Sequence, residues 1–223
     1  MAKTVRGAER RVDALTRERI VDVAIELLDS QGEDGLTFRA LATRLETGHG
    51  AIQWHIANKS ELLKAAAEDV IARVMAEVSG GAEPRQTIRA IALGVYDAID
   101  AHPWVGTQLS QEPWQSAVLQ IFEGVGGQLQ ALGVPERAQF DCASALVSYV
   151  LGLAGQYAAG ARLLARETDR SAFLATLAAR WSQLDPAQYP FAHQMAAQLR
   201  EHDDREQFLA GVDLILTGMT AAR

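Results

Sequence analysis

The chain has 223 residues, 48% of them apolar and 6% aromatic, with six prolines. This length can hold one large or two small domains with a sizeable core, and the composition is typical of a helix-rich globular protein. A formal net charge of −7 argues against a molecule that binds polyanions non-specifically over its whole surface. Alternating β-branched or aromatic runs, which would indicate strands, are hard to find.

Residues 1–14 are expected to form a flexible basic arm. The first nineteen residues carry six basic and three acidic side chains, so the arm could meet phosphate groups, although a solvated, partly disordered tail is an equal alternative. Residues 1–64 carry ten basic and ten acidic side chains, and the remaining residues carry 11 basic and 18 acidic. The acidity therefore lies outside the N-terminal part. The start of the chain has no apolar h-region, so no secretory signal is expected.

Hydrophobic spacing predicts a first helix from about Thr16 to Ser30, with Gly32 as its C-cap. The next segment, 37–63, reads TFRALATRLETGHGAIQWHIANKSELL. In it Thr37 can cap a short helix whose apolar stripe ends before Glu46-Thr47-Gly48, and a second short helix follows with Ile52 and Ile56 on one face. Two short helices joined by about three residues including Gly predict a helix-turn-helix, whose second helix can enter a major groove.

The outward positions of that second helix suit base reading. Small Gly50 and Ala51 allow close approach of the backbone, while His49 and Gln53 offer hydrogen-bonding groups. Turn geometry alone is an equally good reason for Gly48 and Gly50.

The segment after Asn58 predicts a long helix, 59–79. Asn58 can cap it, and Glu61 stands three residues on, where a capping-box partner belongs. We expect this helix to link two functional parts. Beyond residue 84 the chain is expected to be helical, with breaks that include Glu112-Pro113, Gly124–Gly127 and Gly133–Pro135.

Two later segments are strongly apolar: residues 136–165 and the last helix. Residues 144–165 formally resemble a membrane span, but their polar and small residues favour a buried helix of a bundle. The only cysteine, Cys142, excludes an internal disulfide and favours a reducing compartment; a small buried residue is a simpler interpretation of it than a redox sensor.

At positions 15–63 the sequence LTRERIVDVAIELLDSQGEDGLTFRALATRLETGHGAIQWHIANKSELL resembles the tetracycline-repressor (TetR) family of bacterial regulators. The agreement includes Gly-Leu-Thr at 35–37, Leu-Ala at 41–42, Trp-His at 54–55, and Asn-Lys at 58–59 followed by Leu-Leu at 62–63. The C-terminal FAHQMAAQLREHDDREQFLAGVDLILTGM is also similar to the ligand and dimer domain of one branch of that family.

The resemblance implies an all-α homodimer with an N-terminal three-helix helix-turn-helix domain, 15–63, and a larger effector-binding and dimerisation domain, 64–223. It implies a cytoplasmic, ligand-responsive repressor that binds a palindromic operator as a homodimer and is released by a small-molecule effector, with no membrane, metal or cofactor. The residues it assigns to DNA are Thr37, Arg39, Gly48, His49, Gly50, Ala51, Gln53, Trp54, His55 and Lys59. Within that set Arg39 would reach a base, while Thr37, Trp54, His55 and Lys59 would support or contact phosphates.

Simpler interpretations stand beside these roles. Trp54 could pack in the core, His55 could brace the helix end, and Arg39 could be a solvated helix residue. The sequence also departs from the family at Glu46, Thr47 and Gln53, where Gly, an aliphatic residue and Tyr are common. Gln53 could read adenine bidentately.

Residues for the effector would come from the middle helices, although for any single aromatic residue core packing is the commoner role. They are Tyr96, His102, Trp104, Gln108, Trp114, Phe122, Tyr149, Gln156 and Trp181. A dimer interface is expected from the two apolar segments, at Val147, Leu151, Phe208, Val212, Ile215, Leu216 and Met219.

Two other classes of protein compete with a regulator. An enzyme is disfavoured because the histidines lack metal-ligand spacing, no serine or cysteine stands in a nucleophile motif, and Gly124–Gly127 lacks the context of a nucleotide loop. A helical interaction or scaffold module without specific DNA binding is the remaining alternative, favoured by Glu46 and the neutral charge balance of residues 1–64.

Overall fold

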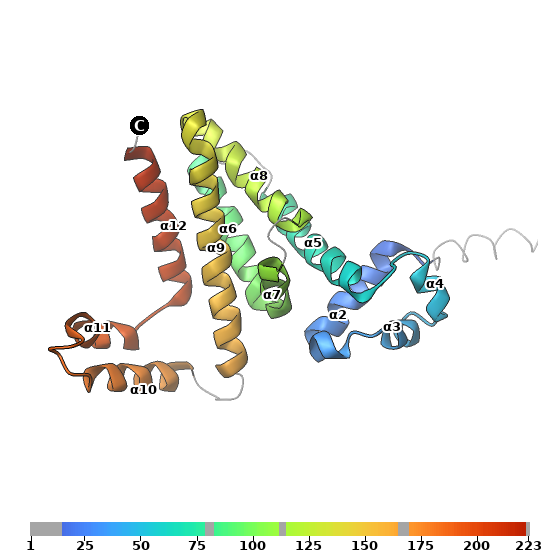
Figure 1. The fold of residues 1–223 in the computed structure, drawn as a ribbon, viewed down its shortest axis with the longest axis horizontal. Helices are drawn as coiled ribbons and strands as arrows, with labels where there is room; N and C mark the ends of the chain where they lie inside the picture. Colours follow the sequence, from blue (N-terminus) through green and yellow to red (C-terminus); the bar gives the residue numbers. More distant parts are fainter. Residues whose placement is uncertain (1–14, 79–82, 112–114, 165–169, 222–223) are drawn as a thin grey trace, which may run out of the picture.

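The computed structural model describes residues 15–78, 83–111, 115–164 and 170–221, and in these ranges it contains helices and no strands (Figure 1). The all-α prediction is therefore confirmed. The expected arm, 1–14, and Trp114 lie outside the described residues.

Three helices form the N-terminal unit, which we call the reading head: α2 (Arg17–Gly35), α3 (Phe38–Arg44) and α4 (His49–Gln53). The Thr16 hydroxyl accepts the Arg19 N–H at 3.2 Å, and the Thr37 hydroxyl accepts the Ala40 N–H at 3.1 Å, so both helices begin at side-chain caps. The regular part of the first helix is interrupted at Gly32, as expected for a C-cap. The helix kinks there, where Gly32 has a φ of 70°, and continues to Gly35.

The helix α5 (Lys59–Val78) joins the head to the rest of the chain, as expected. The Glu61 N–H donates to Asn58 Oδ1 at 2.9 Å, and the Ala57 N–H donates to Glu61 Oε2 at 2.9 Å. This resembles the predicted capping box, displaced by one residue on its return bond. Since Leu62 and Leu63 are buried at its start and Ile71 further along, α5 belongs to the core of both parts.

The second domain contains α6 (Pro84–Ala101), α7 (Pro103–Gln111), α8 (Ser116–Ala131), α9 (Glu136–Leu164), α10 (Arg170–Ser182), α11 (Pro190–Arg200) and α12 (Asp204–Ala221). The helices α6, α7 and α8 lie between α5 and the long α9, and α12 runs beside α9 (Figure 1). The pair α10 and α11 packs mainly on itself at one end of α9 and α12. Ion pairs between Arg89 and Asp213, and between Arg205 and Asp97 at 2.9 Å, hold α12 on α6.

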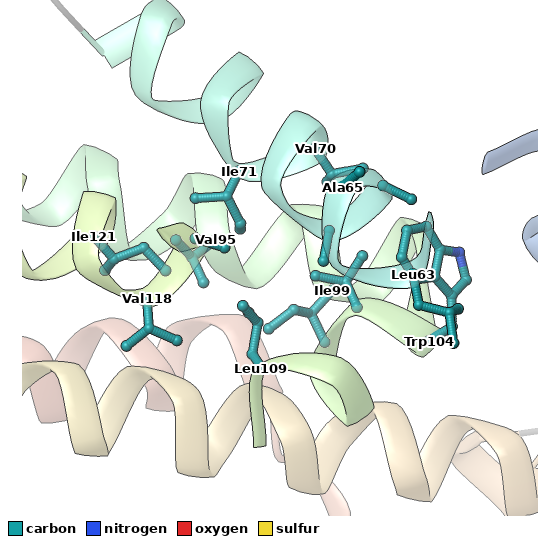
Figure 2. Packing of buried hydrophobic residues seen from close by; sticks show 14 of the residues in the cluster. Leu63, Ala65, Val70, Ile71, Val95, Ile99, Trp104, Leu109, Val118 and Ile121 are labelled. Atoms are coloured by element: carbon teal, nitrogen blue, oxygen red, sulfur yellow. The ribbon is translucent and has the colours of Figure 1, made fainter. Parts of the chain in front are cut away.

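One continuous apolar core fills the space between α5, α6, α7 and α8 (Figure 2). Its fully buried side chains include Ile71, Val95 and Ile121. Burial of each such side chain contributes roughly 1.5–3 kcal/mol of transfer free energy, which makes this core the main stabilising element of the domain.

The predicted helix break at Gly124–Gly127 is wrong, because α8 runs through all four residues. At Gly124 an added Cβ would collide with the Met75 side chain, so the glycine permits close approach of α5 and α8 rather than a turn. None of the helices in the described ranges combines the length and apolarity needed to cross a membrane.

Candidate nucleic-acid interface and effector region

The turn before α4 is held by a Schellman arrangement at the end of α3. The Thr47 N–H donates to the Ala42 carbonyl at 3.0 Å, and the Glu46 N–H donates to the Thr43 carbonyl at 3.4 Å. This arrangement requires a left-handed residue at position 46, and Glu46 adopts it with a φ of 50°. Glu46 is the only non-glycine residue with a positive φ among those described. The glycine that the family prefers at this position therefore has a direct conformational reason.

Helix α4 presents a nearly bare backbone to solvent. Its Ile52 is fully buried and anchors it to the head, whereas Gly48, Gly50 and Ala51 are exposed. A Cβ built on Gly48 or Gly50 would meet no atom within 4 Å, and neither glycine has a positive φ. A positive φ therefore does not explain these two glycines. Gly48 is the N-cap of α4, a position that favours glycine, and the absence of side chains at both positions leaves the backbone of the first turn open to close approach.

The polar and aromatic side chains of α4 also face outward. His49 and Gln53 are exposed, and the His49 ring lies 5.2 Å from the Phe38 ring, a contact that orients it. Trp54 is 89% exposed, so the core-packing interpretation of this residue is excluded within the described chain. The indole is therefore accessible to a binding partner.

The remaining predicted DNA contacts differ in exposure, and one of them already makes a hydrogen bond within the protein. Arg39 is exposed on the first turn of α3, and His55 is half-buried just after α4. The Lys59 ammonium donates to the Glu33 carbonyl of α2, which fixes its position at the start of α5. Two further N–H groups of the ammonium could still meet a phosphate.

One acidic group near this surface has a perturbed titration. Hydrogen bonds from the backbone at Glu18 and from the Thr16 hydroxyl lower the pKa of the Glu18 carboxyl, helped by Arg17 and His55. The first turn of α2 therefore keeps its negative charge.

The effector residues predicted in the second domain, as far as the structure describes them, take several different positions. Tyr96 and Tyr149 both pack on Phe208, with ring centroids 4.9 Å and 5.8 Å away, and the Tyr149 hydroxyl donates to the Phe208 carbonyl at 3.1 Å. Burial raises the pKa of Tyr149. Phe122 contacts Phe140 at 5.9 Å. Tyr96, Tyr149 and Phe208 thus join α6, α9 and α12 at the core, whereas Phe122 packs at the edge of the core against Phe140 of α9, which is 64% exposed.

His102 and Trp104 point toward the reading head. The Asp29 carboxylate of α2 accepts the Trp104 indole N–H at 2.8 Å and lies 2.8 Å from His102 Nδ1. Gln108, one turn beyond Trp104, is the only buried polar side chain among the described residues. Gln156 is exposed on α9, and Trp181 is half-buried on α10.

The described surface includes the following two cavities. One, of about 570 Å³, lies between α5 and α8 and is lined by Met75, Ser116, Leu119, Gln120, Glu123 and Gly124. The other, of about 360 Å³, separates α2 from the corner of α6 and α7 and is lined by Leu28, Asp29, Gly32, Glu33, Ala101, Pro103, Trp104 and Thr107. Among the predicted effector residues only Trp104 lines either one. No signal in the sequence pointed to the other residues that line these two cavities, because their positions depend on how separate helices meet.

The residues expected at a dimer interface divide by burial. Phe208, Val212, Leu216 and Val147 are at most 7% exposed in the single chain, and Leu151, Ile215 and Met219 pack on the same core from its edge. This corrects the expectation for the four buried side chains, which the structure places inside the chain rather than on a surface. On α12, Leu214 is a large apolar side chain that is 74% exposed.

Comparison with known proteins agrees with this architecture. Residues 20–66 match the family described as bacterial regulatory proteins, tetR family, and residues 81–223 match the tetracyclin repressor-like, C-terminal domain. A solved TetR transcriptional regulator from Streptomyces coelicolor has a TM-score of 0.85 and 51% identity, covering 93% of this chain and 99% of that chain.

Curated relatives match over shorter stretches. An HTH-type transcriptional regulator from Saccharopolyspora erythraea is 31% identical over 139 residues, which cover 62% of this chain and 59% of that protein. The tetracycline repressor protein class D of Escherichia coli is 46% identical over 59 residues, 26% of this chain and 27% of that repressor. The chain thus spans less than two thirds of both relatives.

The fold of the second domain also matches a regulator that was solved with small molecules. The TetR family protein ActR from Streptomyces coelicolor, in complex with actinorhodin, has a TM-score of 0.75 at 22% identity over 94% of this chain and 98% of that chain. With both domains matched and the helix-turn-helix in place at 37–58, the chain belongs to the TetR family of bacterial transcriptional regulators.

Proposed function

We propose that this regulator is a repressor that binds a palindromic operator as a homodimer and releases it when a small apolar effector enters the second domain. The observation that carries the proposal is the surface of α4. Its backbone is bare at Gly48 and Gly50, its polar side chains His49 and Gln53 are exposed, and its end carries the exposed Trp54.

This surface suits a major groove. The exposed side of α4 carries hydrogen-bonding groups beside small residues, a combination that lets a helix approach base edges and read them. Gln53 can pair bidentately with adenine, while Arg39 and Lys59 flank the helix with positive charge.

A twofold partner is supported by the outer face of α9 and α12. Leu214 stands there among small, uncharged and exposed residues at helical spacing: Ala145, Ser148 and Gly152 on α9, and Ala210 and Gly218 on α12. Small residues allow two helices to approach closely, and one apolar side chain among them can fill the space between two copies. Two heads held in this way would present α4 helices to successive major grooves.

The effector class is inferred from the second domain. Gln108 is the buried polar side chain among the described residues, and ActR, which shares the fold, is solved with actinorhodin. We expect an apolar, drug-sized ligand oriented by few hydrogen bonds. We also propose that the chain acts through binding alone and catalyses no reaction.

Selection of binding sites from random duplex DNA with the purified full-length chain tests the proposal. We expect an enriched palindrome whose half-sites lie about one helical turn, ~34 Å, apart. Screening apolar compounds for loss of binding to that palindrome then tests the effector. Recovery of no enriched sequence would contradict operator binding, and recovery of a single unpaired half-site would contradict the dimer.

A further inference from the structure

The reading head is attached to the second domain at two places. Along one side α2 packs on α5, where Arg73 of α5 pairs with Asp22 of α2 at 2.6 Å. At the other end of α2, Asp29 meets the corner between α6 and α7 through His102 and Trp104. Because α5 runs from the core of the head into the core of the second domain, it is the natural axis about which the head can turn (Figure 1).

The contact at Asp29 differs from an ordinary packed interface. The cavity of about 360 Å³ lies beside it, with one wall from α2 and the other from the α6–α7 corner. Close-packed side chains therefore do not fill this gap, so packing restrains the head less at this corner than along α5. Directional hydrogen bonds must therefore hold the two walls of the gap in a fixed orientation.

Both donors converge on one oxygen. The Trp104 indole N–H and His102 Nδ1 each lie 2.8 Å from Asp29 Oδ1, and neither donor can move far without losing the bond. Trp104 is 5% exposed and embedded at the end of the apolar core, next to Leu63 in Figure 2, so its N–H is a fixed point of the second domain. The backbone of His102 is fixed too. Its backbone N–H donates to the Ala98 carbonyl at 2.9 Å, and its carbonyl accepts the Val105 N–H at 2.8 Å.

We propose that Asp29 is a positioning residue, which sets the angle of the reading head by binding His102 and Trp104 across the gap. The inference rests on the proposed function for its consequence: in a dimer, the angle of each head sets the spacing between the two α4 helices. A head without this bond would turn about α5 and would accept operators of several spacings.

Three variants separate this role from general stability. Asp29→Ala removes the acceptor, and Trp104→Phe keeps an aromatic ring while removing the N–H. The matched control is Glu26→Ala, on the same helix, whose carboxylate pairs with Arg44 at 3.4 Å inside the head and does not reach the second domain.

The first measurement needs no DNA. Spin labels are placed on the full-length chain at Thr43→Cys in α3 and Ala131→Cys in α8, both exposed, in a Cys142→Ala background, and diluted with unlabelled protein so that label pairs lie within one chain. Distances are read by double electron–electron resonance. Asp29→Ala and Trp104→Phe are expected to broaden the distance distribution, while Glu26→Ala leaves it as in the parent. An unchanged distribution in Asp29→Ala overturns the proposal.

The second measurement uses the selected palindrome with its half-sites moved apart or together one base pair at a time. The parent is expected to prefer one spacing, and Asp29→Ala to reduce that preference on the order of tenfold, as loss of hydrogen bonds to a charged group allows. Equal spacing preference in both proteins overturns the inference. If no palindrome exists but the distribution still broadens, the positioning role stands and the proposed function falls.

Discussion

Glu46 occupies a backbone conformation that L-amino acids other than Asn and Asp rarely adopt. Its φ of 50° completes the Schellman arrangement between α3 and α4, so the chain tolerates strain at the joint of its helix-turn-helix. The sequence alone marked Glu46 as unusual through its charge and through the resemblance, which has glycine at this position. The structure shows that the left-handed backbone conformation of Glu46 sets this position apart more directly than its charge does.

Replacing Glu46 by glycine should stabilise the chain by about 1 kcal/mol, because glycine adopts the left-handed region without a Cβ clash. Urea unfolding measures the change. Thr47→Gly, whose position has no positive φ, is the control and should destabilise slightly through added chain entropy. A Glu46→Gly protein less stable than its parent would mean that the carboxylate makes a contact worth more than the strain.

Lys59 is expected to contribute to phosphate binding despite its bond to the Glu33 carbonyl. Lys59→Ala should reduce the slope of log affinity against log salt concentration by about one for the selected operator. Fluorescence anisotropy of labelled operator over a salt series gives the slope. Arg200→Ala, on the exposed end of α11, should leave it unchanged. Equal slopes for Lys59→Ala and the parent would assign Lys59 to the fold alone.

At the scale of elements, the crossing of α9 and α12 depends on one small residue. A Cβ on Gly211 would collide with the hydroxyl and ring of Tyr149, which packs on Phe208. A rigid aromatic ring moves less readily than a flexible chain, so the helices would have to separate.

Gly211→Ala should therefore destabilise the chain by about 1–3 kcal/mol. The control is Gly127→Ala in α8, where an added Cβ meets nothing within 4 Å and the better helix propensity of alanine should stabilise by up to ~1 kcal/mol. Thermal unfolding followed by circular dichroism compares the two. Equal effects of both substitutions would show that the tight crossing is not maintained in solution.

The same crossing predicts a pH dependence. Burial raises the pKa of Tyr149 above that of an unfolded tyrosine, so the neutral hydroxyl is favoured in the fold. The contribution of the neutral hydroxyl to the free energy of unfolding is fully present below pH ~10 and is lost as pH rises through the raised pKa. Above pH ~10, stability should fall less steeply in Tyr149→Phe than in the parent, measured by urea unfolding at a series of pH values. A parallel fall would assign the alkaline loss to other groups.

Local sequence signals predicted the elements with a cap or an apolar stripe. Thr16, Thr37 and Asn58 each begin the helix that they were expected to begin. The predictions that failed share one cause. The spacing of apolar or small residues along the sequence does not show which part of the molecule each residue contacts. Gly124 permits a close approach instead of a break, and Phe208 faces the chain's own core instead of a partner. The contact of His102 and Trp104 with Asp29 is equally hidden in the sequence, because 73 and 75 positions separate them from it.

At the scale of the whole molecule, the proposed dimer depends on Leu214 on the outer face of α12. Leu214→Arg should yield a monomer, since two like charges would meet across the twofold axis in place of two apolar side chains. Analytical ultracentrifugation measures the mass. Leu119→Arg, which alters a 61% exposed leucine on α8, is the matched control and should not change it. A dimer that survives Leu214→Arg would place the interface elsewhere.

The exposed indole of Trp54 gives the molecule its own optical signal. At 89% exposure Trp54 should emit at the long wavelengths of a water-surrounded tryptophan, whereas Trp104, at 5%, should emit at shorter ones. Contact of α4 with a duplex would remove water from the first indole and leave the second where it is. Subtracting the spectrum of a Trp54→Phe variant removes the emission of the other tryptophans. The red edge of the difference spectrum would then report, without any label, whether α4 is covered by its proposed partner.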